Sequence, residues 1–367
     1  MIRSLGLVLL WISLAGPAVA QSPSGDPATK ANDGAVGVIT GMEGGTYART
    51  GADLTILDSD HLRVLPTLGK GSLQNLSDIL YLRGIDVGFV QADALTYARQ
   101  HNMFPGLTQN IRYIAKLYDE EVHILARKDM TRLEDLDGQR VNVDVTGSGS
   151  AMTAEIVLGL LNIKAKLEHQ SQINAIQELE HGDIAAIIHV GGAPIPLIAN
   201  VPSGSGLHFL PVAMTPALAQ TYLPDRLAHD TYPALIPAGD TVQTIAVGDV
   251  MAVFAWAPNT TRYKRVARFV DAFFSRFSEF QQPPRHPKWR EVNLTAEVPG
   301  WTRFQPAEAW LAAEHTVSGT ASAATQERFN EFLAQAAAGP ANTITDAAKV
   351  VLFRQFLVWD RQQTAAH

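Results

Sequence analysis

From about residue 35 to about residue 280, short apolar runs typical of strands alternate with segments whose apolar residues recur at helical spacing. Residues 62–65 and 87–90 are short β-branched or aliphatic runs, which predict strands. Between them, the apolar positions of residues 73–80 recur at the three- and four-residue spacing of a helix. A strand, a helix and a second strand in this order predict a parallel crossover, and its repetition predicts an α/β fold.

A glycine-rich turn follows a predicted strand and opens a predicted helix at four places, residues 41–47, 69–72, 147–150 and 191–194. The first N–H groups of a helix have no partner within it and carry partial positive charge, so they suit an anion. Two of the turns lie in each half of the α/β region. The pattern therefore predicts a ligand cleft between two lobes, with Lys70 adding a positive charge at its edge.

Other segments complete the two predicted lobes. Residues 111–117 and 122–126 predict a strand pair, after which Lys128 and Asp129 mark the exit from the first lobe. Aromatic residues at helical spacing after Asn259 predict a helix packed in the core. The remaining predicted elements are the strands 140–144, 184–190, 208–212, 244–247 and 251–256 and the helices 151–161 and 171–179.

Several polar residues in this region have both a functional and a structural interpretation. Glu120 and Glu121 are neighbours on a strand and point to opposite faces, so they cannot act as a pair, and we expect a solvated face. His123 has no second histidine or carboxylate at metal-site spacing, so we expect a structural role. Asp93 fits a ligand contact and a helix cap equally well.

The first residues predict export. Arg3, the apolar run 5–14 and the small residues 18–20 predict a signal peptide over residues 1–20, followed by a flexible leader over residues 21–34. The 367 residues include no Cys, which excludes disulfides and thiolate metal sites. Loss of Arg3 with the signal changes the formal net charge from −7 to −8, and the absence of a basic patch argues against nucleic acid as a partner.

The sequence lacks the common catalytic and metal-binding motifs. The turn at residues 147–150 matches neither G-x-x-x-x-G-K-[ST] nor G-x-G-x-x-G, because Met152 stands where the second pattern needs glycine. No G-x-S-x-G, H-E-x-x-H or Asp-rich calcium loop occurs. We therefore expect no catalytic residue, no metal and no cofactor, which favours binding over catalysis.

The motifs in this order resemble the TRAP-associated extracytoplasmic immunogenic (TAXI) solute-binding proteins over about residues 35–280. Where that family usually has Gly-Gly-Ser, this chain has Lys70, Gly71 and Ser72, which favours a more anionic ligand. The resemblance rests on GGTYARTGADL (44–54), GKGSLQNLSDILYLRGIDVGFVQADAL (69–95), IAKLYDEEVHILARKDM (114–130), LEDLDGQRVNVDVTGSGSAMTAEIVL (133–158) and the region 232–256.

The resemblance implies a periplasmic-binding-protein type II fold, in which two α/β lobes enclose a cleft. We expect lobe 1 to comprise residues 35–127 and 229–280, and lobe 2 residues 128–228. Residues 281–367 are longer than the resemblance explains. They predict a C-terminal helical extension packed on lobe 1, with helices near 323–337 and 346–361.

The function that the resemblance implies is a periplasmic receptor. It captures a small carboxylate, a glutamate-like amino acid or a dicarboxylate, by lobe closure and delivers it to a TRAP-type membrane transporter subunit. Lys70 is added to the expected site for its charge alone. The ligand contacts that the resemblance implies are Gly45, Thr46, Tyr47, Ser72, Asn75, Gln91, Ser148, Gly149, Ser150 and Thr153.

Two other functions stay open at this point. The long C-terminal extension is also compatible with a periplasmic sensor or scaffold subunit that acts on a membrane signalling partner. A periplasmic enzyme on the same two-lobe scaffold is a further alternative, because residues of a catalytic site that are distant in the sequence leave no local motif.

Overall fold

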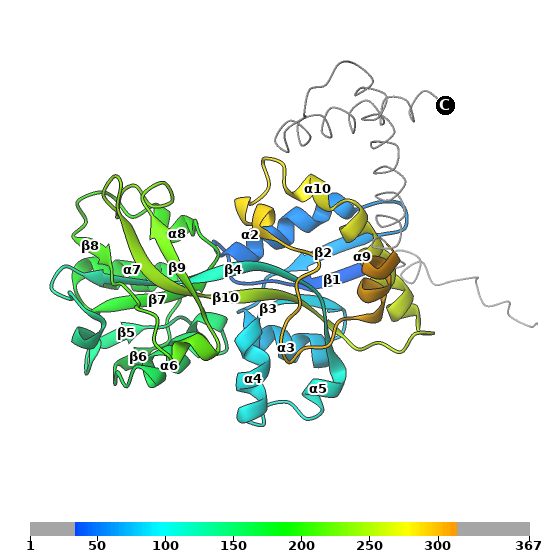
Figure 1. Ribbon diagram of the computed structural model, residues 1–367, viewed down its shortest axis with the longest axis horizontal. Coiled ribbons are helices and arrows are strands. Elements are labelled where there is room, and N and C mark those ends of the chain that lie inside the picture. Colours follow the sequence, from blue (N-terminus) through cyan, green and yellow to red (C-terminus); the bar gives the residue numbers. More distant parts are fainter. Residues whose placement is uncertain (1–33, 314–367) are drawn as a thin grey trace, which may run out of the picture.

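The computed structural model describes residues 34–313, which form two α/β lobes side by side (Figure 1). The periplasmic-binding-protein architecture expected from the sequence is confirmed. The predicted signal peptide, the leader up to residue 33, and the predicted helices near 323–337 and 346–361 lie outside the described residues.

One mixed sheet runs through both lobes in the order β2-β1-β3-β10-β4-β7-β5-β6, with β8 paired to β4 and β9 to β10. In lobe 1, β1 (Ala35–Ile39) pairs in parallel with both β2 (Arg63–Thr67) and β3 (Val87–Gln91). Two long antiparallel strands cross between the lobes, β4 (Ile111–Arg127) and β10 (Thr241–Phe254). The strands of lobe 2 are β5 (Arg140–Asn142), β6 (Lys166–Glu168), β7 (Ala186–Gly191), β8 (Leu207–Phe209) and β9 (Leu223–Ala228).

Helices cover both faces of the lobe 1 strands, with α2 and α10 on one side and α3, α4 and α5 on the other (Figure 1). The lobe 1 helices are α2 (Thr46–Asp53), α3 (Ser72–Tyr81), α4 (Ala92–Gln100), α5 (Leu107–Asn110), α9 (Thr261–Ser275) and α10 (Phe277–Phe280). The lobe 2 helices are α6 (Gly149–Leu160), α7 (Gln172–His181) and α8 (Pro196–Ala199). Short 3₁₀ turns lie at Leu54–Leu57, Leu133–Leu136, Leu218–Gln220 and Pro287–Glu291.

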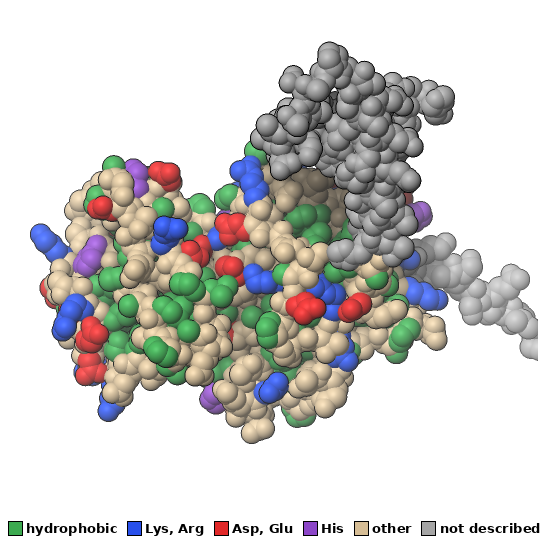
Figure 2. All heavy atoms as spheres, in the orientation of Figure 1, with side chains coloured by type: hydrophobic (Ala, Val, Ile, Leu, Met, Phe, Trp, Pro, Cys, Tyr) green, Lys and Arg blue, Asp and Glu red, His purple; other side chains and the backbone are tan. Residues whose placement is uncertain are grey.

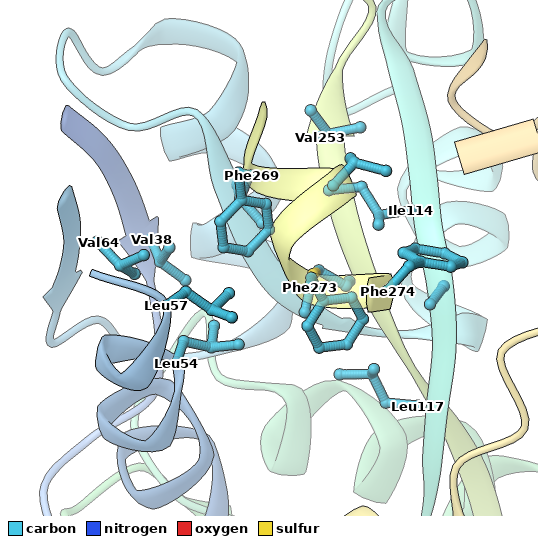
Figure 3. Packing of buried hydrophobic residues seen from close by; sticks show 14 of the residues in the cluster. Val38, Leu54, Leu57, Val64, Ile114, Leu117, Val253, Phe269, Phe273 and Phe274 are labelled. Atoms are coloured by element: carbon cyan, nitrogen blue, oxygen red, sulfur yellow. The ribbon is translucent and has the colours of Figure 1, made fainter. Parts of the chain in front are cut away.

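The aromatic stripe of α9 forms much of the lobe 1 core, as predicted. Phe269 and Phe273 are fully buried and pack with Val38, Leu54 and Ile114 (Figure 3). Burial of each such side chain stabilises the fold by roughly 1.5–3 kcal/mol. The core thus holds the carboxyl ends of β1 and β3, and the turns that follow them, in a fixed position.

The lobe boundaries differ from those predicted. Residues 111–127 form one strand instead of a strand pair: the first half of β4 pairs with β10 in lobe 1, and its second half pairs with β7 in lobe 2. The passage between lobes therefore lies inside β4 and β10, and not at 127/128 and 228/229. Tyr232 and Ile236, assigned to lobe 1 from the sequence, pack in lobe 2 with Leu125 and Ile187.

The described part of the C-terminal extension, residues 281–313, packs on lobe 1. Trp289 is fully buried against Phe273 and Phe280, and its indole N–H donates to Asp53 Oδ2 at 2.9 Å. Phe304 joins the same cluster. Trp289 therefore anchors this segment to the core of lobe 1.

Charged groups of both signs are scattered over the face seen in Figure 2. No single-sign field covers that face, in line with the absence of a basic patch in the sequence. Among residues 34–313, no helix is both long and apolar enough to cross a membrane.

Candidate functional site

A cavity of about 80 Å³ lies between the two lobes. All four predicted glycine turns contribute to its wall: residues 41–47 and 70–72 from lobe 1, and residues 148–150 and Gly191 from lobe 2. A single water molecule needs about 10–15 Å³ on this kind of measure, so the cavity has room for a small solute. The structure therefore brings together the turns that the sequence predicted to form one cleft.

Four helices begin at this cavity. Thr46, Ser72, Gly149 and Gln172 are the first residues of α2, α3, α6 and α7, and all four line the cavity. Ser148 and Ser171 cap α6 and α7 through their hydroxyls, whereas glycine precedes α2 and α3 without a side-chain cap. The first N–H groups of each helix have no partner inside it, so the cavity is surrounded by donors with partial positive charge.

The two lobes touch each other around the cavity. Gln74 N–H donates to Gly147 O at 3.1 Å, and Thr46 Oγ1 donates to Gly192 O at 2.8 Å. A Cβ atom on Gly149 would lie 2.6 Å from Ser72 Oγ and would also overlap Gln91 Oε1. Glycine is therefore required at this position by the close approach of the lobes, which a turn argument from the sequence could not reveal.

Most of the predicted site residues line the cavity. The exceptions are Asn75 and Thr153: Asn75 Nδ2 donates to Thr40 O and Phe89 O at 2.8 and 2.7 Å, and Thr153 Oγ1 donates to Asp93 at 2.9 Å. Both side chains thus hold the walls of the site in place. The predicted residues that line the cavity are Gly45, Thr46, Tyr47, Lys70, Ser72, Gln91, Ser148, Gly149 and Ser150.

The hydroxyl groups expected to bind ligand already have partners. Ser72 Oγ donates to Gln91 Oε1 at 3.0 Å and accepts from Gln91 N–H at 3.0 Å. Ser150 Oγ accepts from Val190 N–H at 3.0 Å. Ser72 is not the cap of α3, because Gly71 holds that position. The donors left facing the cavity are mainly backbone N–H groups.

Acidic residues that the sequence analysis did not assign to the site lie at the lobe 1 side of the cavity. Glu120 lines it, is 2% exposed, and accepts a hydrogen bond from Gln91 Nε2 at 3.0 Å. Asp249, on the neighbouring strand β10, is fully buried. Burial, and next the Asp249 charge, raise the pKa of Glu120 well above its usual range, and burial raises the pKa of Asp249 to about 8.

The solvated face predicted for Glu120 and Glu121 is wrong, because both residues are buried in the middle of the sheet. Their opposite orientation is confirmed. On the other face of β4, Glu121 forms an ion pair with Lys288 Nζ at 2.5 Å and accepts from Ala193 N–H at 2.9 Å. Lys288 is only 4% exposed and comes from the C-terminal extension. Among sequence signals, a charged Asp249 within an apolar strand pointed most clearly to a buried site.

His123 is structural, as predicted. Its Nδ1 lies 2.8 Å from Glu121 O and its Nε2 lies 2.9 Å from Tyr232 Oη. Burial lowers its pKa to about 3, and it lowers the pKa of the cavity-lining His189 to about 4, so both rings are neutral near neutral pH.

Asp93 bridges the lobes. Its Oδ2 accepts from Thr153 Oγ1 of α6 at 2.9 Å and from Tyr222 Oη at 3.1 Å. Burial raises its pKa to about 6. Asp93 does not line the cavity, so its observed role is a contact between the two lobes. No cluster of three or more metal-ligating side chains is found among residues 34–313.

Comparison with known proteins defines the family. Residues 38–297 match the model of the NMT1-like family. This chain belongs to the NMT1-like family. The residues that line the cavity all lie within the matched range.

Several solved structures have a similar arrangement at low sequence identity. ArgBP from T. maritima, in a mutant form, is 15% identical with a TM-score of 0.38, and the match covers 68% of this chain and 91% of that one. Tv2483 bound to L-arginine is 11% identical with a TM-score of 0.43, covering 73% and 95%. A protein from Bordetella bronchiseptica RB50 is 13% identical with a TM-score of 0.44, covering 71% and 76%. At these scores, the similarities say nothing about the ligand of this chain.

Proposed function

We propose that this protein is an extracytoplasmic receptor that captures a small carboxylate solute between its lobes and delivers it to a TRAP-type membrane transporter. The observation that carries the proposal is the convergence of four helix N-termini on one cavity between two lobes. Binding, and not turnover, is the activity proposed, since the sequence holds none of the catalytic motifs considered above.

The donors around the cavity suit a carboxylate. Each helix N-terminus stabilises a nearby anion by roughly 0.3–1 kcal/mol, and by up to ~2 kcal/mol when it is partly buried. No Arg lines the cavity within the described part of the chain, and its one lysine, Lys70, lies exposed at the rim. A carboxylate would therefore be held mainly by backbone N–H groups of α2, α3, α6 and α7.

Export and transporter coupling are supported by the sequence alone. The signal peptide predicted over residues 1–20 supports a periplasmic location, and the TAXI resemblance supports a TRAP-type partner. Fractionation of cells that express the full chain tests the location. We expect the protein in the periplasmic fraction with Gln21 as its first residue, and an uncleaved cytoplasmic protein would contradict this part of the proposal.

The test of the receptor is a binding experiment on residues 21–367, unfolded and refolded to remove carried-over ligand. Thermal shifts are recorded against amino acids, dicarboxylates and monocarboxylates, followed by calorimetry on the best compounds. A ligand that binds only the native state raises the free energy of unfolding by ~2.7 kcal/mol when its concentration is a hundred times its Kd. A panel without any shift would contradict the proposal.

A matched pair of glycine variants tests lobe closure. Gly149→Ala places a Cβ against Ser72 and Gln91 across the lobe contact, so we expect affinity to fall by at least ~10-fold, which is about 1.4 kcal/mol. Gly159→Ala in the same helix adds a Cβ that meets nothing within 4 Å. The second variant should bind as the unmodified protein does, and equal affinities for both variants would contradict closure at Gly149.

A further inference from the structure

Helix α6 is part of the hydrophobic core of both lobes, and it lies next to α4 where the lobes meet (Figure 1). Ala154 and Val157 pack in the core of lobe 2. Met152 is only 2% exposed and packs in a lobe 1 cluster that includes Leu76 of α3. Ile156 packs against both clusters. The contact between the lobes therefore includes side chains that are buried as deeply as those of a core.

The sequence of α6 agrees with this packing in both lobes. Its twelve residues, GSAMTAEIVLGL, include a single charged side chain, Glu155, and no continuous polar face. A helix that covered lobe 2 alone would present a polar face to water. If the lobes separated, Met152 and Ile156 would expose apolar surface toward lobe 1, which is unfavourable.

A buried polar contact lies beside the apolar one. Asp93 Oδ2, on α4, accepts from Thr153 Oγ1 of α6 at 2.9 Å and from Tyr222 Oη of lobe 2 at 3.1 Å. All three side chains are buried. Separation of the lobes would break both hydrogen bonds. We call the residues of the two contacts the interlobe seam: Asp93, Met152, Thr153, Ile156 and Tyr222.

The interlobe seam directly borders the cavity. Ser148, Gly149 and Ser150, at the start of α6, line the cavity, and Met152 and Thr153 follow within the same helix. Because a helix moves as a unit, the start of α6 cannot move away from lobe 1 while Met152 and Thr153 keep their contacts there. Opening of the cavity on this side therefore requires opening of the seam.

We infer that the interlobe seam holds the two lobes together by itself, without the help of a bound solute, and that it must open before a solute can enter or leave the cavity. The seam then sets the rate of solute exchange, and the solute itself is not needed to bring the lobes together. This inference goes beyond the receptor proposed above, because it holds for a solute of any chemistry.

A single thiol inside the cavity tests the inference without any solute, because the chain has no Cys of its own. Ser150→Cys places the thiol at a cavity position that is 5% exposed, and Arg83→Cys places one on the exposed surface of lobe 1 as a reference. The reagent is dithiobis(nitrobenzoate), whose two aromatic rings are too large for a cavity of about 80 Å³. In refolded 21–367, we expect the cavity thiol to react at least ~100-fold more slowly than the exposed one.

Variants of the seam should accelerate this reaction. Met152→Gln places a polar side chain of similar length in the lobe 1 cluster, and should raise the rate at the Ser150→Cys thiol by at least ~10-fold. Met152→Leu keeps the apolar volume and should change the rate by less than ~3-fold. Tyr222→Phe removes only the hydroxyl that donates to Asp93, and should raise the rate by at least ~3-fold even if Met152→Gln does not fold. Tyr81→Phe, at an exposed tyrosine of lobe 1, is its matched control.

A distance between the lobes distinguishes opening of the seam from unfolding. Spin labels on Arg83→Cys and Lys164→Cys, both at exposed positions, report on lobe 1 and lobe 2. Without solute, the intact seam should give a single short distance, and Met152→Gln should add a longer one. The inference is overturned if the cavity thiol reacts as fast as the exposed one, or if neither Met152→Gln nor Tyr222→Phe changes its rate. The receptor is judged separately, by the solute panel, so either proposal can fail without the other.

Discussion

The two faces of β4 at Glu120 and Glu121 differ in how they treat the same side chain. On one face, Glu121 has a lysine at 2.5 Å and a backbone donor at 2.9 Å. On the other, Glu120 accepts from the neutral Gln91 amide at 3.0 Å and lies beside the acidic Asp249, with no cation bound to it. The Glu121 carboxylate is thus neutralised within the protein, whereas Glu120 lies at the cavity beside a second acidic residue.

The two faces of β4 therefore contact different parts of the molecule. The Glu121 face ties the crossing strand to Ala193 of lobe 2 and to the C-terminal extension through Lys288. The Glu120 face opens to the cavity between the lobes. Desolvating a charge is costly, so Glu121 is paired with Lys288, whereas burial raises the pKa of Glu120 and favours its neutral form.

The largest loss of stability should come from Lys288→Met, which leaves the buried Glu121 without its cation. Leaving one partner of a buried ion pair alone costs about 3–5 kcal/mol, and we expect the free energy of unfolding to fall by that amount in a urea titration. Lys264→Met, at an exposed helix position, should change it by less than ~0.5 kcal/mol. Adding Glu121→Gln to Lys288→Met should restore much of the loss, and a double variant no better than the single one would contradict the pairing.

Asp249→Asn should weaken the pH dependence of the free energy of unfolding. The folded pKa of Asp249 is raised from its ordinary value of 3.8 to about 8, so its contribution to stability is fully present below pH 3.8 and is lost as the pH rises toward about 8. The variant should flatten the decline in unfolding free energy over this window, by up to ~1.4 kcal/mol per pH unit. Chemical denaturation at several pH values measures the slope, with Asp240→Asn, an exposed position, as the control. An unchanged slope would show that Asp249 is not responsible.

Gln91→Met removes the amide donor to Glu120 Oε2 and the acceptor of the Ser72 hydroxyl, while the bond from the backbone N–H of residue 91 to Ser72 Oγ stays. A hydrogen bond to a charged group contributes about 1.5–3 kcal/mol, so we expect a stability loss of this order without ligand. Gln74→Met is the control, because the side chain of this part-buried glutamine hydrogen-bonds only Asp78. It should lower the free energy of unfolding by less than ~1 kcal/mol. Equal losses in the two variants would argue against a special role of the Glu120 contact.

The smallest effect is expected for Lys70→Met. This variant tests whether an exposed lysine at the rim contributes to ligand affinity. Exposed charge pairs contribute about 0.2–1 kcal/mol, so affinity for the best ligand should change by no more than ~5-fold. Lys128→Met, away from the cavity, is the matched control in the calorimetric titration. A loss of more than ~50-fold at Lys70 would assign it a direct ligand contact.

Much of the cavity wall was predictable because it is local. Glycine turns that open a helix at residues 41–47, 69–72 and 147–150 place free N–H groups at the ends of strands, and parallel strands bring those ends together. Asn75 and Thr153 lie in the same helices, but on the sides that face Thr40 and Asp93. Local sequence could not show that these two side chains point away from the cavity, since their direction depends on how each helix is rotated against its neighbours.

The polar segment inside β4 was the main error of interpretation. Residues 118–121 look like a break between two short strands, since polar residues interrupt the apolar alternation. In the structure they are the point where a single strand passes between lobes, with β10 on one side and β7 on the other. Glu121 needs a lysine 167 positions away, and Glu120 lies beside Asp249 of the returning strand.

By itself, the sequence determined where helices start and which turns can bring backbone donors close to a ligand, since both depend on neighbouring residues only. The tertiary structure decided the charge at each buried group. Two identical, adjacent glutamates acquired opposite environments because the electrostatic energy of a buried carboxylate depends on the distant side chains that share its low-dielectric surroundings.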